Sequence, residues 1–127
     1  MRRLILLGVI TFSLMLSACA KESSASEAIE SYLKAKVDSD AEKLVALACA
    51  DYEAEATLDA DSFAGLNAKL QGLTCTESGT EGDSTLVTCN GTLQIEYRGE
   101  EPRTSPLDDT VYLARKVGGE WKMCGQR

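Results

Sequence analysis

The sequence contains no histidine among its 127 residues. Histidine is the commonest general base in enzymes, a very common metal ligand, and the partner of the nucleophile in Ser–His and Cys–His catalytic pairs. Its absence excludes the hydrolytic and metal-dependent chemistries that rely on it. Enzymes that work with a buried carboxylate or a tyrosine–carboxylate pair remain open.

Basic residues are also scarce. Thirteen Lys and Arg stand against twenty Asp and Glu, which gives a formal net charge of −7. Because nucleic-acid binding draws on clustered basic side chains, we expect no DNA or RNA partner. Only two prolines occur, and 44% hydrophobic with 26% charged residues is typical of a folded chain. The length suits one core rather than two domains.

Long apolar runs are absent except at residues 4–16, which follow the basic pair Arg2-Arg3. Crossing a bilayer takes about 20 apolar residues, so this run is too short for a comfortable membrane helix. Lys21 and Glu22 end it soon afterwards. A basic start, a short apolar run and small residues at its end are typical of a secretory signal, so we expect export.

The run closes with Leu16-Ser17-Ala18-Cys19, which closely resembles the lipobox of bacterial lipoproteins. The resemblance implies that residues 1–18 are a signal peptide and that Cys19, acylated with diacylglycerol, becomes the first mature residue. Residues 19–25 then form the lipidated cysteine and a polar tether, and residues 26–127 a single domain. Several acyl chains on one residue anchor a protein stably to a membrane. The alternative is a plain secretory signal with an incidental cysteine.

The residue after the lipobox bears on the location. Ala20 stands where an aspartate would signal retention at the inner membrane. The resemblance therefore implies the outer membrane in a bacterium with two membranes, and the outer face of the plasma membrane in a bacterium with one. In both cases the protein is a lipid-anchored component of the cell envelope.

Four of the five cysteines remain once Cys19 is lipidated, and an even number in a small exported domain indicates two disulfides. Three pairings are possible. Cys75 and Cys89 flank the turn-rich residues 77–83 and would face each other across a hairpin, which leaves Cys49 for Cys124. Because the spacing lacks C-x-x-C pairs, we expect no zinc site, and no other metal or cofactor is expected.

Helical periodicity dominates the first half of the mature chain. One apolar stripe begins near Ser26, and Asp40 is suited to cap a second helix that carries Cys49 beside its buried face. A third, short helix is expected over residues 61–70. Glu53, Glu55, Asp59 and Asp61 are interpreted as a solvated acidic surface. The buried stripes are Ile29, Tyr32, Leu33 and Val37; Leu44, Val45, Leu47 and Ala48; and Phe63, Leu66 and Leu70.

The pattern changes to strands after Gly72. Residues 87–97 alternate between apolar and polar side chains, which is typical of an antiparallel strand with one wet face. Residues 98–106 hold both prolines and are expected to form a loop. Gly118-Gly119 predicts a hairpin turn between two final strands. The fold class is therefore α+β, with N-terminal helices packed on a curved antiparallel sheet of about four strands.

The order of these features resembles the small bacterial lipoproteins of the nuclear-transport-factor-2-like (cystatin-like) superfamily. The motifs are the opening helix Ala28-Ile29-Glu30-Ser31-Tyr32-Leu33, the acidic break Asp38-Ser39-Asp40, and the closing strand with Gly119-Glu120-Trp121-Lys122. The resemblance covers roughly residues 26–125 and implies a half-cone with a cavity at its open end. Members are enzymes or binding proteins, and many dimerise through the sheet, so a homodimer is also implied.

Within such a cone, the candidate pocket-lining residues are Tyr32, Tyr97, Tyr112 and Trp121, although each also suits a core position. No catalytic residue is assigned. We expect a non-catalytic module that binds a small apolar ligand or an envelope protein. The alternative is an isomerase or dehydratase-like enzyme with a carboxylate inside the cone and a tyrosine that polarises the substrate.

Overall fold

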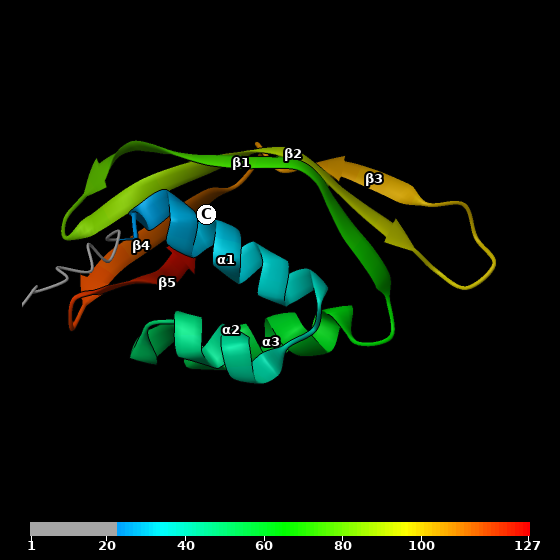
Figure 1. Ribbon diagram of the computed structural model, residues 1–127, viewed down its shortest axis with the longest axis horizontal. Coiled ribbons are helices and arrows are strands. Elements are labelled where there is room, and N and C mark those ends of the chain that lie inside the picture. The colour runs from blue at the N-terminus through cyan, green and yellow to red at the C-terminus, as the bar shows by residue number, and fades with distance from the viewer. Residues whose placement is uncertain (1–22) are drawn as a thin grey trace, which may run out of the picture.

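The computed structural model describes residues 23–127, which form helices packed against an antiparallel sheet (Figure 1). Helix α1 spans Ala25–Val37. The Ser24 hydroxyl accepts a hydrogen bond from the Glu27 amide at 3.2 Å and caps its start. Of its expected apolar stripe, Ile29, Tyr32 and Leu33 are buried, and Val37 at the end of the helix is half-buried. None of the helices in this part of the chain is long and apolar enough to cross a membrane.

Two further helices and a short 3-10 turn complete the helical layer. Helix α2 spans Ala41–Leu47 and is capped by the Asp40 carboxylate, as the sequence predicts. The chain then passes through η1, Ala50–Tyr52, into α3, Glu53–Phe63. Cys49 lies between α2 and η1 rather than on a helix.

The third helix therefore lies earlier than expected. The prediction over residues 61–70 is wrong, because α3 ends at Phe63 and the chain turns at Gly65, which has a φ of 77°. Small side chains explain the error. The buried face of α3 is made mainly of Ala56 and Ala60, which give a weak hydrophobic signal but allow close packing.

Five antiparallel strands form one sheet, in place of the four expected. They are β1 (Asn67–Glu81), β2 (Ser84–Glu96), β3 (Arg103–Pro106), β4 (Val111–Val117) and β5 (Glu120–Gln126). The order is β1-β2-β4-β5, and β3 pairs with β2 beyond the end of β4. The loop predicted over residues 98–106 thus contains a short strand. Pro106 is tolerated there because β3 has a neighbour on one side only.

A long hairpin of β1 and β2 arches over α1 (Figure 1). The hairpin between the cysteines forms as expected, but its strands continue through most of the turn-rich residues 77–83 to a two-residue turn at Gly82-Asp83. Strand β1 begins before Gly72, where the helix-to-strand change was expected, and Gly72 instead lies at a register shift. A Cβ on Gly91 would lie 2.6 Å from the backbone oxygen of Gln71, so only glycine fits where the two strands approach.

The core lies between the helices and the concave face of the sheet. Helix α1 packs against β1, β2, β4 and β5, and α2 and α3 pack beneath it. Val87, Cys89 and Met123 are fully buried from the sheet side. The two expected cysteine pairs are bonded, with Cα atoms 4.9 Å apart for Cys49–Cys124 and 4.0 Å apart for Cys75–Cys89.

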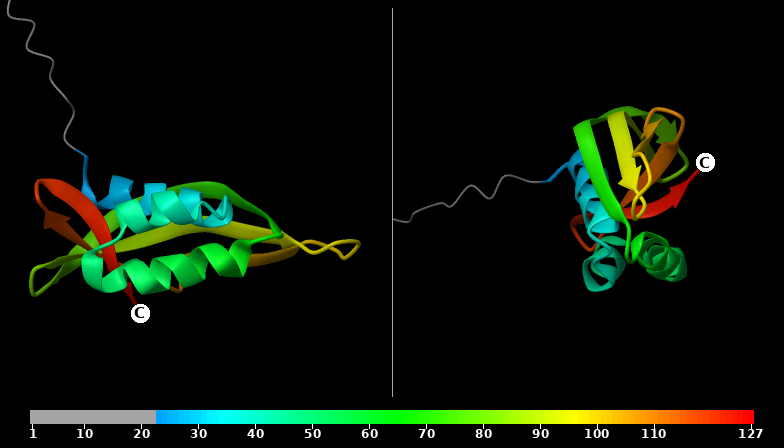
Figure 2. Two further views of the ribbon diagram at one scale, coloured as in Figure 1. Left: turned by 90° about the horizontal axis from the view of Figure 1, so that it is seen from below. Right: turned by 90° about the vertical axis from the view of Figure 1, so that its right-hand side faces the viewer.

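The domain is elongated, with two distinct ends (Figure 2). We call one the turn end, which holds the start of α1 and the turns at residues 82–83 and 118–119. The opposite one is the loop end, which holds the end of α1, the end of α3 and the loop at residues 97–102. The two ends carry different features.

Candidate functional site

A cleft of about 240 Å³ opens between the helices and the sheet, on the side of the loop end. The volume lies just below the range of roughly 300–1,000 Å³ usual for small-molecule pockets. Its walls come from the end of α1, the end of α3, all five strands and the segment that joins β3 to β4. The lining residues are Leu33, Lys36, Val37, Phe63, Leu70, Leu93, Ser105, Pro106, Leu107, Thr110, Tyr112 and Gln126.

The lining divides into an apolar majority and a few polar groups. Seven of these side chains are hydrocarbon or aromatic without a polar atom. Polar atoms come from Lys36, Ser105, Thr110, Tyr112 and Gln126. This composition, an apolar surface with a few polar groups that fix orientation, is typical of small-ligand sites.

One wall of the cleft is backed by a polar cluster that joins α1 to α3. Tyr32 donates its hydroxyl hydrogen bond to Oδ2 of Asp59 at 2.7 Å. Lys36, one turn further along α1, places its Nζ 2.8 Å from Oδ1 of the same carboxylate. Both charged side chains are largely shielded, with relative exposures of 19% and 16% for Lys36 and Asp59. Each oxygen of Asp59 therefore has a defined partner.

Lys36 connects this cluster to the cleft. Its Nζ lies 5.5 Å from the centroid of the Phe63 ring, within the range of a cation–π contact. Both residues line the cleft. The cleft therefore has an ammonium group at its wall, held in place by a carboxylate on one side and an aromatic face on the other.

Three buried tyrosines surround this region. Burial raises the pKa of the Tyr32 hydroxyl far above its ordinary value of 10, and its hydrogen bond to the Asp59 carboxylate raises it further. Burial, with smaller effects of Asp59 and Glu55, raises the pKa of Tyr52 to about 12. Burial also raises the pKa of Tyr112, against a smaller lowering by the Thr110 side chain. All three hydroxyls are neutral donors at physiological pH.

The four aromatic residues proposed to line one pocket do not come together. Of these four, Tyr112 alone lines the cleft. Tyr32 is fully buried with its hydroxyl committed to Asp59. Tyr97 is 42% exposed near the loop end, and Trp121 borders a separate hollow at the turn end. The structure does not bring these four residues together in one pocket, because Tyr32 is enclosed in the core and Tyr97 and Trp121 lie near different ends of the domain.

Lys36 and Asp59 are the site residues that the sequence analysis missed. Asp59 was interpreted as part of a solvated acidic surface, yet it lies opposite α1 on the buried side of α3. A weak signal exists, since Asp59 falls between Ala56 and Phe63 at helical spacing from both. The signal becomes visible only when residues 53–63 are read as a helix.

Two other expectations concern lipidation and metal binding. Cys19, the proposed lipid site, lies outside the described residues. Among residues 23–127 there is no group of three or more His, Cys, Asp or Glu side chains placed to hold a metal ion.

Comparisons with known proteins bear on the fold. No family model matches the chain, and no curated protein matches it. Among solved structures, the chain is similar to a SEC-C motif containing protein from Rhodopseudomonas palustris, with a TM-score of 0.54 and 13% sequence identity. The alignment covers 83% of this chain and 80% of that one. At this identity the likeness shows a shared α+β fold and nothing about activity.

Proposed function

We propose that the protein is a lipid-anchored lipoprotein of the bacterial cell envelope whose domain binds a small, mainly apolar ligand without catalysis. The cleft between α1, α3 and the sheet is the observation that carries the binding function. Its apolar lining gives affinity by burial of hydrocarbon, and its polar groups suit a ligand that also carries a hydrogen-bond acceptor or an anionic group.

The envelope location is supported by the sequence and by the cysteines. The basic start, the short apolar run and Leu16-Ser17-Ala18-Cys19 have the order of a lipoprotein signal. Disulfides such as those that join Cys49 to Cys124 and Cys75 to Cys89 persist in oxidising compartments outside the cytoplasm. As argued from Ala20, the membrane is the outer one, or the plasma membrane where only one exists.

The cystatin-like half-cone belongs to the same proposal. Its support is the long β1–β2 hairpin that arches over α1 (Figure 1). Leu70 of β1 and Leu93 of β2 contribute to the lining of the cleft. A homodimer or an envelope protein docked on the sheet is the other partner implied by the resemblance. We favour a small ligand because the cleft is a concave site that helices and strands line on several sides.

An enzyme of the isomerase or dehydratase type is the second candidate, favoured by the hydrogen bond from Tyr32 to Asp59. Such an enzyme needs a tyrosine or a carboxylate that reaches the substrate. Here Tyr32 is fully buried, and neither it nor Asp59 lines the cleft. Both oxygens of Asp59 are occupied, so the pair holds α1 to α3 rather than facing a ligand.

The anchor is tested by Cys19→Ala. We expect the wild-type chain to enter the detergent phase with the mass of an acylated, cleaved protein, and the variant to keep residues 1–18 and carry no added lipid mass. Equal masses and equal partitioning of the two chains would contradict the proposal.

The cleft is tested with anilinonaphthalene sulfonate, an apolar fluorescent probe that carries one anionic group. The hydrophobic core, from Ala25 to Met123, and both disulfides lie within residues 20–127. These residues, exported behind a signal peptide without a lipobox, provide the material for the experiment. We expect saturable probe binding that is lost in Leu93→Trp, which fills the cleft. Ser31→Trp, which fills the hollow at the turn end, is the matched control and should bind the probe like wild type. The reverse pattern would contradict the proposal.

A further inference from the structure

A second hollow, of about 310 Å³, lies at the turn end beside the start of α1. Its apolar part consists of Ala28, Leu47 and the ring of Trp121, and its lining also includes Ser23, close to the start of α1. Trp121 is half-buried, so part of its ring is accessible within the hollow. The residues that line it are Ser23, Glu27, Ala28, Ser31, Leu47, Glu120 and Trp121.

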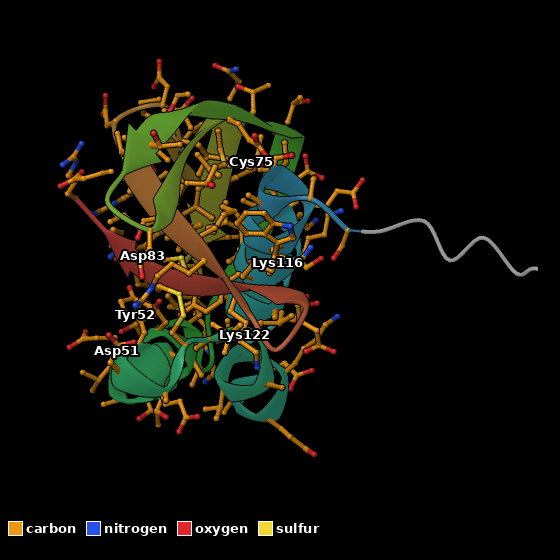
Figure 3. All side chains as sticks on the ribbon, turned by 90° about the vertical axis from the view of Figure 1, so that its left-hand side faces the viewer. Asp51, Tyr52, Cys75, Asp83, Lys116 and Lys122 are labelled. Atoms are coloured by element: carbon orange, nitrogen blue, oxygen red, sulfur yellow. A yellow bond between two sulfur atoms is a disulfide. The ribbon has the colours of Figure 1, made fainter. Side chains whose placement is uncertain are left out.

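The nearby β4–β5 turn carries a further exposed apolar side chain. Trp121 pairs with Lys116, and Val117 precedes Gly118-Gly119 at the tip of this hairpin. Val117 is 46% exposed, one of three large hydrophobic side chains among the described residues with such exposure. Figure 3 looks onto this end of the domain and labels Lys116 and Lys122 on the same hairpin.

The covalent chain limits how far this end can lie from a membrane. Ser23 follows Cys19 by four residues. A fully extended chain spans at most about 3.6 Å per residue, so four residues reach about 14 Å. If Cys19 carries the lipid, Ser23 and the hollow that it lines cannot lie much further than this from the bilayer surface.

We propose that the turn end is a membrane-contacting surface, with Trp121, its hollow and the Val117 turn in the headgroup region of the bilayer that holds Cys19. This inference rests on the proposed lipidation. A tryptophan ring with a polar N–H is suited to the boundary between headgroups and hydrocarbon. The charges point to a zwitterionic rather than a strongly anionic lipid surface, because this end has no excess of basic residues. The basic residues Lys116, Lys122 and Arg115 stand against the acidic residues Glu27, Glu120, Asp51 and Asp83.

The orientation has a consequence for the cleft. Helix α1, with 13 residues, is about 20 Å long, and the cleft lies at its C-terminal end. With the turn end on the bilayer, the cleft opens toward the aqueous compartment. The domain then takes its ligand from that compartment rather than from the lipids beneath it.

Trp121 is the single tryptophan of the chain, so its fluorescence reports on this surface alone. The full-length chain, acylated and processed in a bacterial host, is reconstituted into phosphatidylcholine vesicles with or without brominated acyl chains. We expect at least a twofold loss of Trp121 emission with the brominated lipid, with little change in high salt. The matched control is the double variant Trp121→Phe, Tyr97→Trp, which moves the tryptophan to the loop end and should show no quenching.

Flotation of the vesicles on a density gradient separates the two possible failures. If the chain does not float with the vesicles, the anchor is wrong, and the orientation is overturned with it. If the chain floats but Trp121 is not quenched, the anchor stands and the orientation is wrong. In that case the tether or a second copy of the chain covers Trp121. Equal quenching at positions 121 and 97 would likewise overturn the orientation.

Discussion

Different interactions stabilise the two ends of this domain. Toward the turn end, covalent bonds and an ion-pair network join the elements: Cys49 is bonded to Cys124, and Arg115 binds both carboxylate oxygens of Asp51 at 3.1 Å. Asp83, on the β1–β2 turn, lies 3.9 Å from the same guanidinium group (Figure 3). Toward the loop end, the helices are joined through the hydrogen bond and ion pair of Asp59.

The turn end is therefore the more rigid end, and the loop end can open more easily. Ligand sites are commonly found where local opening costs little free energy, whereas covalent cross-links raise that cost. No disulfide-bonded cysteine lines the cleft, whereas Cys49–Cys124 lies toward the proposed membrane surface. A ligand can then enter at one end while the other end keeps its shape.

The largest expected effect comes from removing the cross-links. In the entropic model, loss of Cys49–Cys124, with a sequence separation of 75, lowers the free energy of unfolding by about 4.5 kcal/mol. Loss of Cys75–Cys89, with a separation of 14, lowers it by about 3 kcal/mol. Urea denaturation of the two double alanine variants measures both values. A larger loss for the shorter loop would contradict this ranking.

Gly91 lies between the two ends, where β2 passes from pairing with β4 to pairing with β3. Gly91→Ala should cost about 3 kcal/mol, because its φ is 116° and the new Cβ would meet backbone atoms of Gln71 and Gly72. Gly72→Ala is the control. Its φ is 64° but nothing lies within 4 Å, so we expect a cost of about 1 kcal/mol. Equal losses of stability in the two variants, measured by urea denaturation, would show that the backbone contact at Gly91 does not matter.

Asp59→Ala tests the noncovalent link of the loop end. The change leaves the buried Tyr32 hydroxyl without an acceptor and Lys36 without its partner, so we expect a loss of about 2 kcal/mol. Asp61→Ala, at an exposed position of the same helix, should stay within about 0.5 kcal/mol of wild type. Hydrogen exchange should also rise in α3 but not near Cys75–Cys89. A uniform rise across the domain would contradict the separation of the two ends.

Alkaline pH should lower the stability of the domain through two buried tyrosines, Tyr32 on α1 and Tyr52 in η1. The pKa of Tyr32 and of Tyr52 is raised on folding, so the stability from their neutral hydroxyls is fully present below pH 10. It is lost as the pH rises from 10 toward the folded value, which is about 12 for Tyr52. We expect the urea midpoint to fall over this range, and less steeply in Tyr32→Phe.

The exposed Tyr97 supplies the control for this pH dependence. Tyr97→Phe should leave the slope of the urea midpoint against pH unchanged. The same slope in Tyr32→Phe as in wild type would show that the buried hydroxyl near Asp59 does not account for the alkaline loss.

Local patterns were sufficient to predict much of the scaffold. The apolar stripe of α1, the Asp40 cap of α2 and the Gly118-Gly119 turn are each determined by neighbouring residues, and each is observed. The pairing of Cys75 with Cys89 also follows from a local hairpin. Such features depend on interactions within a few residues, so a single sequence can reveal them.

The remaining differences arise from contacts between distant residues. Phe63, Leu66 and Leu70 have helical spacing, but Leu70 instead pairs with Leu93 in the sheet. Strand β3 forms only because β2 extends beyond β4 and offers it a partner. The cleft draws on α1, α3, all five strands and the segment between β3 and β4, and the burial of Asp59 depends on the approach of α3 to α1. Apart from the weak helical spacing of Asp59, none of these features is encoded in a local pattern.

The most direct experiment is to determine at which of the two ends a ligand binds. Amide chemical shifts of residues 20–127 would be followed by nuclear magnetic resonance during titration with anilinonaphthalene sulfonate. We expect saturable shifts at Lys36, Phe63 and Thr110 beside the cleft, with the amides of Ser31 and Trp121 unchanged. Saturable shifts at Ser31 and Trp121 with none beside the cleft would contradict this expectation.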